Sequence, residues 1–169
     1  MSAWKLGNVA SNWVHQFLSI NGKKILEFGC GEGTIERSKK YDVTAIEHDP
    51  IYLSDELRCY HAPLVFIEGA QCYWYDINCF KELQSEKFDI IIIDGPPGRI
   101  GRNGILTQPW IFEMSNCILI DDTHRDEESE LVTKIEAILI NVDREDLIEK
   151  SEWGVRKSTI LNWSGKFDC

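Results

Sequence analysis

A run of isoleucines near the middle of the chain sets the strongest limit on the fold. Residues 88–93 read FDIIII, a strand-sized and almost wholly apolar stretch. Such a stretch is typical of a strand buried on both faces, at the centre of a parallel sheet that helices cover on each side. Other strand-sized apolar runs alternate with helical patterns along the chain. The sequence therefore predicts an α/β fold with a mainly parallel sheet.

The other elements follow from periodicity and from turn residues. Trp153-Gly154 is typical of a hairpin turn, so an antiparallel pair over residues 146–151 and 155–161 is expected to close the sheet. The third strand has two candidates, residues 57–61 and 64–67. The 169 residues suit a single domain over residues 1–169. The remaining expected strands are residues 24–28, 43–47 and 117–120, and the expected helices are residues 8–19, a short segment after residue 33, 76–83, 105–114 and 127–140.

Charge narrows the class of partner. Acidic residues outnumber basic ones by 28 to 18, for a formal net charge of −10. Such a surface repels phosphate backbones and anionic lipid, so nucleic acids and membranes are not expected as general partners. No apolar run is long enough to span a bilayer, and the amino-terminal residues lack a signal-peptide pattern. Small or sugar-like acceptors fit this composition better.

The cysteines indicate the compartment. Six are present, and they show neither a CxxC pair nor a zinc-ligand spacing. Without a secretory signal, reduced thiols are expected and the protein is predicted to be cytoplasmic. The six are Cys30, Cys59, Cys72, Cys79, Cys117 and Cys169.

A glycine turn follows the first strand. Residues 27–34 read EFGCGEGT, so Thr34 stands where a dinucleotide fingerprint would carry its third glycine. Gly29-x-Gly31-x-Gly33 with an acid two residues earlier is instead the pattern of S-adenosylmethionine (SAM) methyltransferases, in which Glu27 would accept from the amino group of the cofactor. Glu47 lies 18 residues after Gly29, an interval at which a carboxylate reaches ribose hydroxyls.

Aspartates end two of the expected strands. Asp94 follows the isoleucine run, and Asp121-Asp122 follow residues 117–120. Ligands of parallel sheets bind at the carboxyl ends of strands, so three carboxylates are expected together. A hard divalent cation, Mg²⁺ or Mn²⁺, would relieve their repulsion and lower the pKa of a substrate hydroxyl. The alternative is that these aspartates cap turns, and that Asp122 or Asp126 caps the acidic helix that follows.

Two further segments are expected to border a substrate pocket. Residues 95–104, GPPGRIGRNG, are too rich in Gly and Pro for regular structure. Arg99 and Arg102 in this loop could take an anionic acceptor group in a bidentate pair, or they could be solvated arginines that pair with local acids. Residues 73–75, YWY, could form an aromatic rim, although core packing is the preferred interpretation for Trp74.

Together these residues resemble the class I SAM-dependent methyltransferases. Residues 88–98 (FDIIIIDGPPG), the later Gly101-Arg102 and residues 120–125 (IDDTHR) are similar to small bacterial sugar or polysaccharide methyltransferases. They also follow the D-x-P-x-G…G-R…D-x-x-R pattern of plant glucuronoxylan 4-O-methyltransferases. Residues 61–64 (HAPL) and 74–76 (WYD) fit the same group, which favours residues 57–61 as the third strand.

The resemblance implies a Rossmann-like sheet of seven strands, a carboxyl-terminal antiparallel hairpin, helices on both faces, and a set of site residues. Asp94, Asp121 and Asp122 are similar to the metal ligands of catechol-type O-methyltransferases. Those enzymes have a lysine base where this chain has Pro97, so His124 is the best substitute, and catalytic roles are expected for Asp94, Asp122 and His124. Acceptor contacts are expected from Tyr75, Arg99, Arg102 and Arg125. Cofactor contacts are expected from Glu27, Phe28, Gly29, Cys30, Gly31, Gly33, Thr34, Glu47, His48, Ala62 and Asp94.

The leading hypothesis is a SAM-dependent O-methyltransferase that acts on a hydroxyl of a sugar, a glycan precursor or another small acceptor, assisted by a divalent cation. An N-methyltransferase of a small molecule is one alternative, although an amine nucleophile gains little from a metal. A catalytically silent SAM-binding partner subunit is the other. Because the chain has little beyond the core fold, a homo-oligomer or a partner chain could complete the acceptor site.

Overall fold

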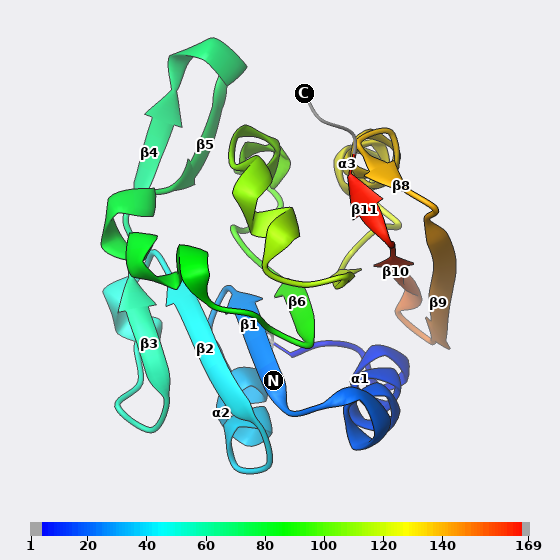
Figure 1. Cartoon of the computed structure of the whole chain (residues 1–169). Coiled ribbons are helices and arrows are strands. Elements are labelled where there is room, and N and C mark those ends of the chain that lie inside the picture. The colour runs from blue at the N-terminus through cyan, green and yellow to red at the C-terminus, as the bar shows by residue number, and fades with distance from the viewer. Residues whose placement is uncertain (1–4, 167–169) are drawn as a thin grey trace.

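The computed structural model describes residues 5–166 and is built around a seven-stranded sheet (Figure 1). The strand order is β3-β2-β1-β6-β7-β10-β9. The first five of these strands run parallel, whereas β10 is antiparallel to both β7 and β9. This confirms the predicted mostly parallel sheet with an antiparallel hairpin at its end. The bounds are β1 (Lys24–Phe28), β2 (Asp42–Glu47), β3 (Arg58–His61), β6 (Ile90–Ile93), β7 (Cys117–Ile120), β9 (Asp143–Ser151) and β10 (Gly154–Asn162).

Helices cover both faces of the sheet, as the isoleucine run predicted. Helix α1 (Asn8–Asn21) buries Ala10, Val14 and Leu18, which are spaced four residues apart and so lie on one stripe. They belong to one core cluster with Ile90 and Ile92 of β6. The intervening Ile91 and Ile93 point to the other face, where they join a second cluster with residues of α3 (Asp126–Glu136). Helix α2 (Glu32–Ser38) follows the glycine turn and contacts β2.

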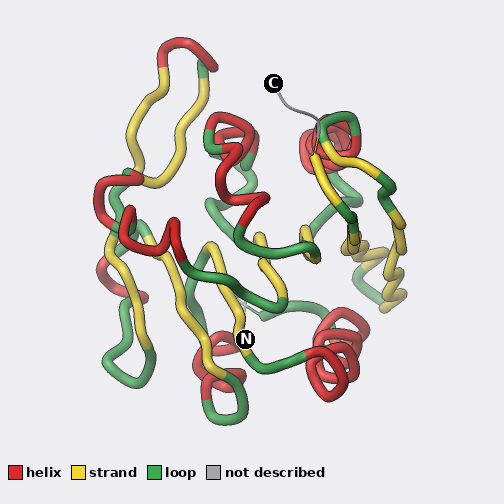
Figure 2. The backbone as a smooth tube through the Cα atoms, in the orientation of Figure 1, coloured by secondary structure: helices red, strands yellow, loops and turns green. Residues whose placement is uncertain are grey.

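Two of the expected α-helices are instead short 3-10 turns (Figure 2). Residues 76–83 form η3 (Ile77–Cys79) and η4 (Lys81–Ser85), because Phe80 between them has non-helical dihedrals. Residues 105–114 form η5 (Asn103–Thr107) and η6 (Pro109–Glu113), separated at Gln108. The residue before a proline is driven out of the helical region, which explains the break at Gln108.

The helix expected over residues 127–140 ends at Glu136, because the following residues form a second small sheet. Strand β8 (Leu139–Ile140) pairs there with β11 (Gly165–Lys166). The prediction was right about the acidic first turn, where negative charge favours the helix dipole. It made the helix four residues too long.

The two candidates for the third strand have different roles. Residues 58–61 form β3 in the main sheet, which confirms the choice of residues 57–61. Residues 64–67 form β4 (Leu64–Ile67), which pairs with β5 (Cys72–Tyr75) in a separate hairpin that projects from the body (Figure 1). On β5, Tyr73 is exposed, whereas Trp74 and Tyr75 are buried, so core packing is the right interpretation for Trp74.

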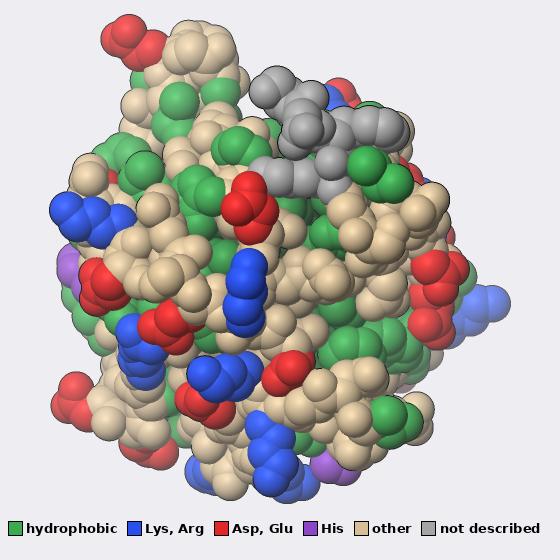
Figure 3. All heavy atoms as spheres, viewed as in Figure 1, with side chains coloured by type: hydrophobic (Ala, Val, Ile, Leu, Met, Phe, Trp, Pro, Cys, Tyr) green, Lys and Arg blue, Asp and Glu red, His purple; other side chains and the backbone are tan. Residues whose placement is uncertain are grey.

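The surface does not gather charge of one sign on the face drawn in Figure 3, where acidic and basic side chains are interspersed. No helix within residues 5–166 combines the length and the apolar character needed to cross a membrane. The five cysteines among these residues are free thiols, and Cys169 lies outside the described residues.

Candidate functional site

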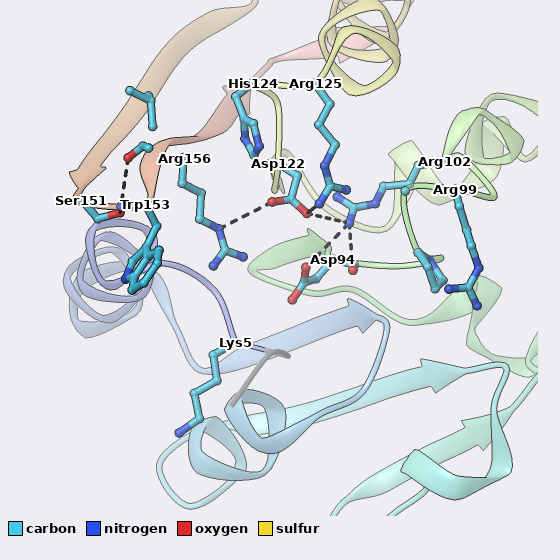
Figure 4. Close-up of a pocket in the computed structure, with 14 residues that line it drawn as sticks. Lys5, Asp94, Arg99, Arg102, Asp122, His124, Arg125, Ser151, Trp153 and Arg156 are labelled. Carbon is cyan, nitrogen blue, oxygen red and sulfur yellow. Dashed lines mark hydrogen bonds and ion pairs between the residues drawn. The ribbon is translucent and has the colours of Figure 1, made fainter. Parts of the chain in front are cut away.

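Two cavities lie side by side at the carboxyl end of β6. The glycine-turn cavity, about 260 Å³, is lined by residues that follow β1, β2 and β6, and by Tyr75 of β5. The arginine cavity, about 790 Å³, is lined by the loop after β6, the residues after β7 and the turn of the β9–β10 hairpin (Figure 4). Asp94, Pro97 and Arg99 line both cavities. A ligand in one cavity would therefore meet a ligand in the other at these residues.

The glycine turn and the loop after β6 approach each other too closely for a side chain at Gly29 in the turn or at Gly95 in the loop. Gly29 has a φ of +97°, and a Cβ atom there would lie 3.0 Å from the backbone nitrogen of Gly95. A Cβ atom on Gly95 would in turn lie 2.5 Å from the hydroxyl of Tyr75. Gly31, by contrast, has extended backbone with a φ of −167° and lines the cavity. Its missing side chain leaves room for a ligand.

Glu27 supports the turn rather than facing the cavity. Its buried carboxylate accepts a hydrogen bond from Thr34 Oγ1 at 3.1 Å and forms an ion pair with Arg37. It does not line the cavity, so the expected direct contact with a cofactor amino group stays a prediction. Thr34 Oγ1 accepts from the backbone N–H of Gly31 at 3.0 Å. Glu27 therefore acts on the turn through Thr34.

Glu47 lies where the 18-residue interval predicted, at the wall of the glycine-turn cavity. Its buried carboxylate accepts from the backbone N–H of Cys30 at 2.8 Å, and from those of His48 and Asp49 at 2.7 Å each. The bond from Cys30 ties the end of β2 to the glycine turn, and the other two hold the residues that follow β2. Asp49 and Asp94 also line the wall, and Arg99 is the one lysine or arginine among the lining residues. Acidic side chains therefore outnumber basic ones in this cavity.

Of the eleven expected cofactor contacts, seven line the glycine-turn cavity and four do not. Phe28 is in the core, Gly33 faces a different hollow beside α1, and Ala62 is buried, with its N–H bonded to the Glu47 carbonyl at 2.8 Å. Those three residues, like Glu27, do not line the cavity, so their expected cofactor contacts stay predictions. The seven are Gly29, Cys30, Gly31, Thr34, Glu47, His48 and Asp94, and the lining residues that sequence reasoning missed are Asp49, Tyr52, Gly95, Pro96 and Pro97.

The three aspartates meet, as their positions after β6 and β7 predicted. One carboxylate oxygen of each lies within 4.8 Å of the others. Asp121 is fully buried, accepts from Ser158 Oγ at 2.6 Å and forms an ion pair with Arg156. Asp122 has a φ of +59° and pairs with Arg125 at 3.0 Å. Helix α3 has no side-chain cap, so the alternative that Asp122 or Asp126 caps it is wrong.

Arg102 is a structural clamp. The side chain is 3% exposed, and its guanidinium donates to the carbonyl oxygens of Ile93, Asp94, Pro96 and Asp121 at 2.7 to 3.3 Å. A further N–H reaches Asp122 Oδ2 at 3.4 Å. All five donors of the guanidinium are engaged within the protein. Arg102 does line the arginine cavity, and its predicted role in binding the acceptor stays a prediction.

Three arginines surround the carboxylates from different segments. Figure 4 shows Arg102, Arg125 and Arg156 pointing toward Asp122, whereas Arg99 points away from it. Among residues 5–166 no hydrogen bond or ion pair engages Arg99, and it stays a candidate for an anionic group. Burial, together with the charge of Asp121, raises the pKa of Asp94 to about 8.

The β9–β10 hairpin supplies residues that sequence reasoning missed. Trp153, 90% exposed at the turn, and Arg156 line the arginine cavity, as does Lys5 from the amino-terminal segment. Trp153 was interpreted only as a turn residue, and nothing in the spacing linked Arg156 to Asp121. The expected His124 and Arg125 do line this cavity; His124 Nδ1 accepts from the backbone N–H of Lys157 at 3.4 Å. Tyr75, expected at the acceptor, lines the glycine-turn cavity instead.

Known proteins resemble this chain in structure but not in sequence. No protein-family profile matches it, and no curated protein matches it. An O-methyltransferase from Bacillus cereus in complex with S-adenosylhomocysteine (SAH) has a TM-score of 0.67 at 15% identity, covering 96% of this chain and 84% of its own. The SAM-bound O-methyltransferase TomG from Streptomyces achromogenes has a TM-score of 0.62 at 12% identity, covering 96% and 82%.

A ribosomal RNA methyltransferase from Plasmodium falciparum has a TM-score of 0.52 at 16% identity, covering 92% of this chain and 96% of its own. At these identities the comparisons establish the fold. The chain has the fold of the class I SAM-dependent methyltransferases, as the sequence resemblance implied. The neighbours act on different kinds of acceptor, so the acceptor must be argued from the site itself.

Proposed function

We propose that this protein is a SAM-dependent O-methyltransferase whose acceptor is a sugar, a glycan precursor or another small molecule with a hydroxyl. The observation that carries the proposal is the meeting of two cavities at Asp94, Pro97 and Arg99. Methyl transfer needs a donor and an acceptor in line and in contact. The glycine-turn cavity would hold SAM and the arginine cavity the acceptor.

The chemistry of the glycine-turn cavity favours SAM over a dinucleotide. SAM carries a sulfonium and an ammonium group, whereas NAD carries a pyrophosphate. The walls present Glu47 and Asp49, which attract a cation and repel phosphates. Glu47 would take the ribose hydroxyls, and the absence of a side chain at Gly31 would let the cofactor approach the turn.

The arginine cavity and the net charge favour a small acceptor over RNA. A chain with a formal net charge of −10 repels a phosphate backbone at long range. Within the cavity, Arg99 and the half-exposed Arg125 offer guanidinium groups to a carboxylate or a single phosphate. The exposed indole of Trp153 suits the apolar face of a sugar ring or another planar group. We place the reaction in the cytoplasm, where free thiols persist.

The aspartate cluster fits a divalent cation, which we include in the proposal. Three carboxylates with oxygens within 4.8 Å of one another are the hard donors that Mg²⁺ and Mn²⁺ prefer. Asp94, Asp121 and Asp122 would hold the ion. A bound cation would lower the pKa of an acceptor hydroxyl. The same need for activation favours a hydroxyl over an amine acceptor.

One residue beside the cluster could take the proton from the acceptor hydroxyl. His124 lines the arginine cavity on the other side of Asp122, whereas Asp94 would be a ligand of the cation. An acceptor cavity with these groups argues against a silent SAM-binding subunit.

Calorimetric titration with SAH tests the cofactor site directly. The wild-type protein should bind SAH, and Gly31→Val should abolish binding, because the new side chain enters the cavity while extended backbone tolerates it. Gly69→Val is the matched control, since a Cβ atom there meets no atom within 4 Å. Unchanged SAH affinity in a folded Gly31→Val variant would contradict the assignment.

The acceptor class is tested with isotope-labelled SAM. Neutral sugars, uronic acids, sugar phosphates, small amines and an RNA transcript are offered separately, each with and without EDTA. Label transfer to a sugar or another small hydroxyl compound is expected, with a loss of transfer in EDTA that Mg²⁺ or Mn²⁺ restores. Transfer to RNA or to amines alone would replace the proposed acceptor. Full activity in EDTA would remove the cation from the proposal.

A further inference from the structure

A buried phenol hydroxyl in the wall of the glycine-turn cavity has no partner. Tyr75, the last residue of β5, is 1% exposed. Its ring packs against Phe28 and Trp74, with ring centroids 5.6 and 5.0 Å apart. Its hydroxyl forms no hydrogen bond with any residue in the described part of the chain. Buried polar groups of native proteins are nearly always paired, so this hydroxyl indicates a ligand that the cavity receives.

The position of the hydroxyl limits which part of a ligand it can touch. Glu47 and Asp94 line the same cavity as Tyr75. Glu47 is at the end assigned to the ribose, and Asp94 is at the junction with the arginine cavity, where the methyl group would be transferred. The hydroxyl also borders Gly95, where a Cβ atom would lie 2.5 Å from it. It therefore lies beside Gly95 on the wall that also carries Glu47 and Asp94, which would put it between the ribose and the point of transfer.

The hydroxyl is neutral under working conditions. Burial, followed by the negative charge of Glu47, raises the pKa of Tyr75 well above its usual value. A neutral phenol offers one O–H donor and two oxygen lone pairs. The lone pairs attract a positive charge, and the cavity wall around them is acidic.

We propose that the Tyr75 hydroxyl binds SAM at its sulfonium centre and makes the site prefer SAM over SAH. The inference rests on the proposed function, since it assumes that SAM occupies the glycine-turn cavity. The sulfonium of SAM is a cation that an oxygen lone pair attracts, whereas the sulfur of SAH is uncharged. Because the contact is lost when the methyl group leaves, it would favour the exchange of product for substrate.

The test compares Tyr75→Phe with Tyr73→Phe by calorimetric titration of SAM and of SAH. Tyr75→Phe keeps the buried ring and removes only the hydroxyl, while Tyr73 is exposed on the same strand. SAM affinity should fall about 3- to 10-fold in Tyr75→Phe, the size expected for one lost polar contact. SAH affinity should change less than twofold, and Tyr73→Phe should change neither.

The melting temperature of the ligand-free variants separates binding from folding. Removing a buried hydroxyl without a partner should leave the melting temperature of Tyr75→Phe unchanged or raise it. Unchanged SAM affinity in a folded Tyr75→Phe variant would overturn the inference and leave the proposed function intact. An equal loss for SAM and SAH would overturn the sulfonium contact. A wild-type protein that binds neither ligand would overturn the proposed function, and this inference with it.

Discussion

At the residue scale, two glycines of the same turn differ in what they permit. Gly29 needs its left-handed φ of +97° and its close contact with Gly95, whereas Gly31 needs only an empty space beside it. Gly29→Ala should therefore destabilise the fold by about 1–3 kcal/mol, which lowers the melting temperature by about 2–4 °C per kcal/mol. Scanning calorimetry of Gly29→Ala beside Gly31→Val measures this. Equal melting temperatures would contradict the distinction.

The raised pKa of Asp94 makes the stability of the folded protein depend on pH. Its pKa is about 8 in the folded protein, because of burial and then Asp121, against an ordinary 3.8. The folded state therefore binds a proton that the unfolded state releases between pH 4 and 8, so this group lowers stability as pH rises through that range. Asp94→Asn, neutral throughout, should match the wild type at pH 4 and exceed it at pH 8.

Urea unfolding in EDTA at pH 4, 6 and 8 measures this difference. The slope that a single group adds is at most about 1.4 kcal/mol per pH unit. Other titrating groups are common to both proteins, so they cancel in the comparison. Stability profiles of wild type and Asp94→Asn that run parallel would show that Asp94 titrates normally.

At the scale of the elements, one side chain holds the loop of residues 95–104 to two strands. Arg102 bonds to carbonyl oxygens at the ends of β6 and β7 and to that of Pro96 within the loop. Arg102→Met leaves these carbonyls unpaired and removes the positive charge that lies beside Asp122 and Glu128. The variant should lose about 3–5 kcal/mol of stability.

Arg99→Met is the matched control, because Arg99 lies in the same loop without such bonds. It should stay within about 0.5 kcal/mol of the wild type. Denaturant unfolding of both variants decides between a clamp and a binding residue. If Arg102→Met is as stable as Arg99→Met and loses only acceptor turnover, Arg102 binds the acceptor, as the sequence predicted, and is not a structural clamp.

The elements also show which parts of the fold the sequence could predict. Strands β1 and β7 coincide with their predicted ranges, because apolar runs bounded by turn residues leave one arrangement for a buried strand. Residues 105–114 are helical in pattern, yet the α-helical prediction failed at Pro109, where a local rule outweighed the apolar spacing. Residues 64–67 have a strand pattern, but the pattern does not say which sheet they join.

The candidate site was predictable where it follows strand ends. Glu47 and the three aspartates were found because the carboxyl ends of parallel strands share one edge. Arg156 was not, since its approach to Asp121 depends on the antiparallel register of β10 beside β7, in which Thr159 pairs with Ile120. The direction of Arg102 was also hidden, because an arginine in a polar loop gives no sign that its donors meet backbone carbonyls.

At the scale of the whole molecule, an acidic chain assembles three of its seven arginines around one cluster of acids. The loop after β6, the residues after β7 and strand β10 each contribute one arginine, and together these surround Asp121 and Asp122. Charges this close and this buried interact strongly. A divalent cation at Asp94, Asp121 and Asp122 would therefore compete with these arginines, of which Arg156 pairs with both Asp121 and Asp122.

Arg156→Gln should consequently bind Mn²⁺ more tightly than the wild type. Arg156 pairs with Asp121 and lies 3.6 Å from Asp122 Oδ1 through Nε, so its removal frees carboxylate oxygens for the ion. We expect a gain of about 10-fold or more, which corresponds to about 1.4 kcal/mol. Titration calorimetry with MnCl₂ on the purified protein, free of cofactor and acceptor, measures the affinity.

The control must remove the same charge from the same cavity without touching the carboxylates. Lys5→Gln does so, because Lys5 lines the arginine cavity but pairs with Glu36 at 2.6 Å. It should raise Mn²⁺ affinity less than twofold. In EDTA, Arg156→Gln should melt below the wild type, since it leaves the fully buried Asp121 without its counter-ion, and Mn²⁺ should restore the melting temperature. Equal Mn²⁺ affinity in Arg156→Gln and Lys5→Gln would show that Arg156 acts only through the overall electrostatic potential of the cavity. If neither variant nor the wild type binds Mn²⁺, the arginines alone neutralise the aspartates.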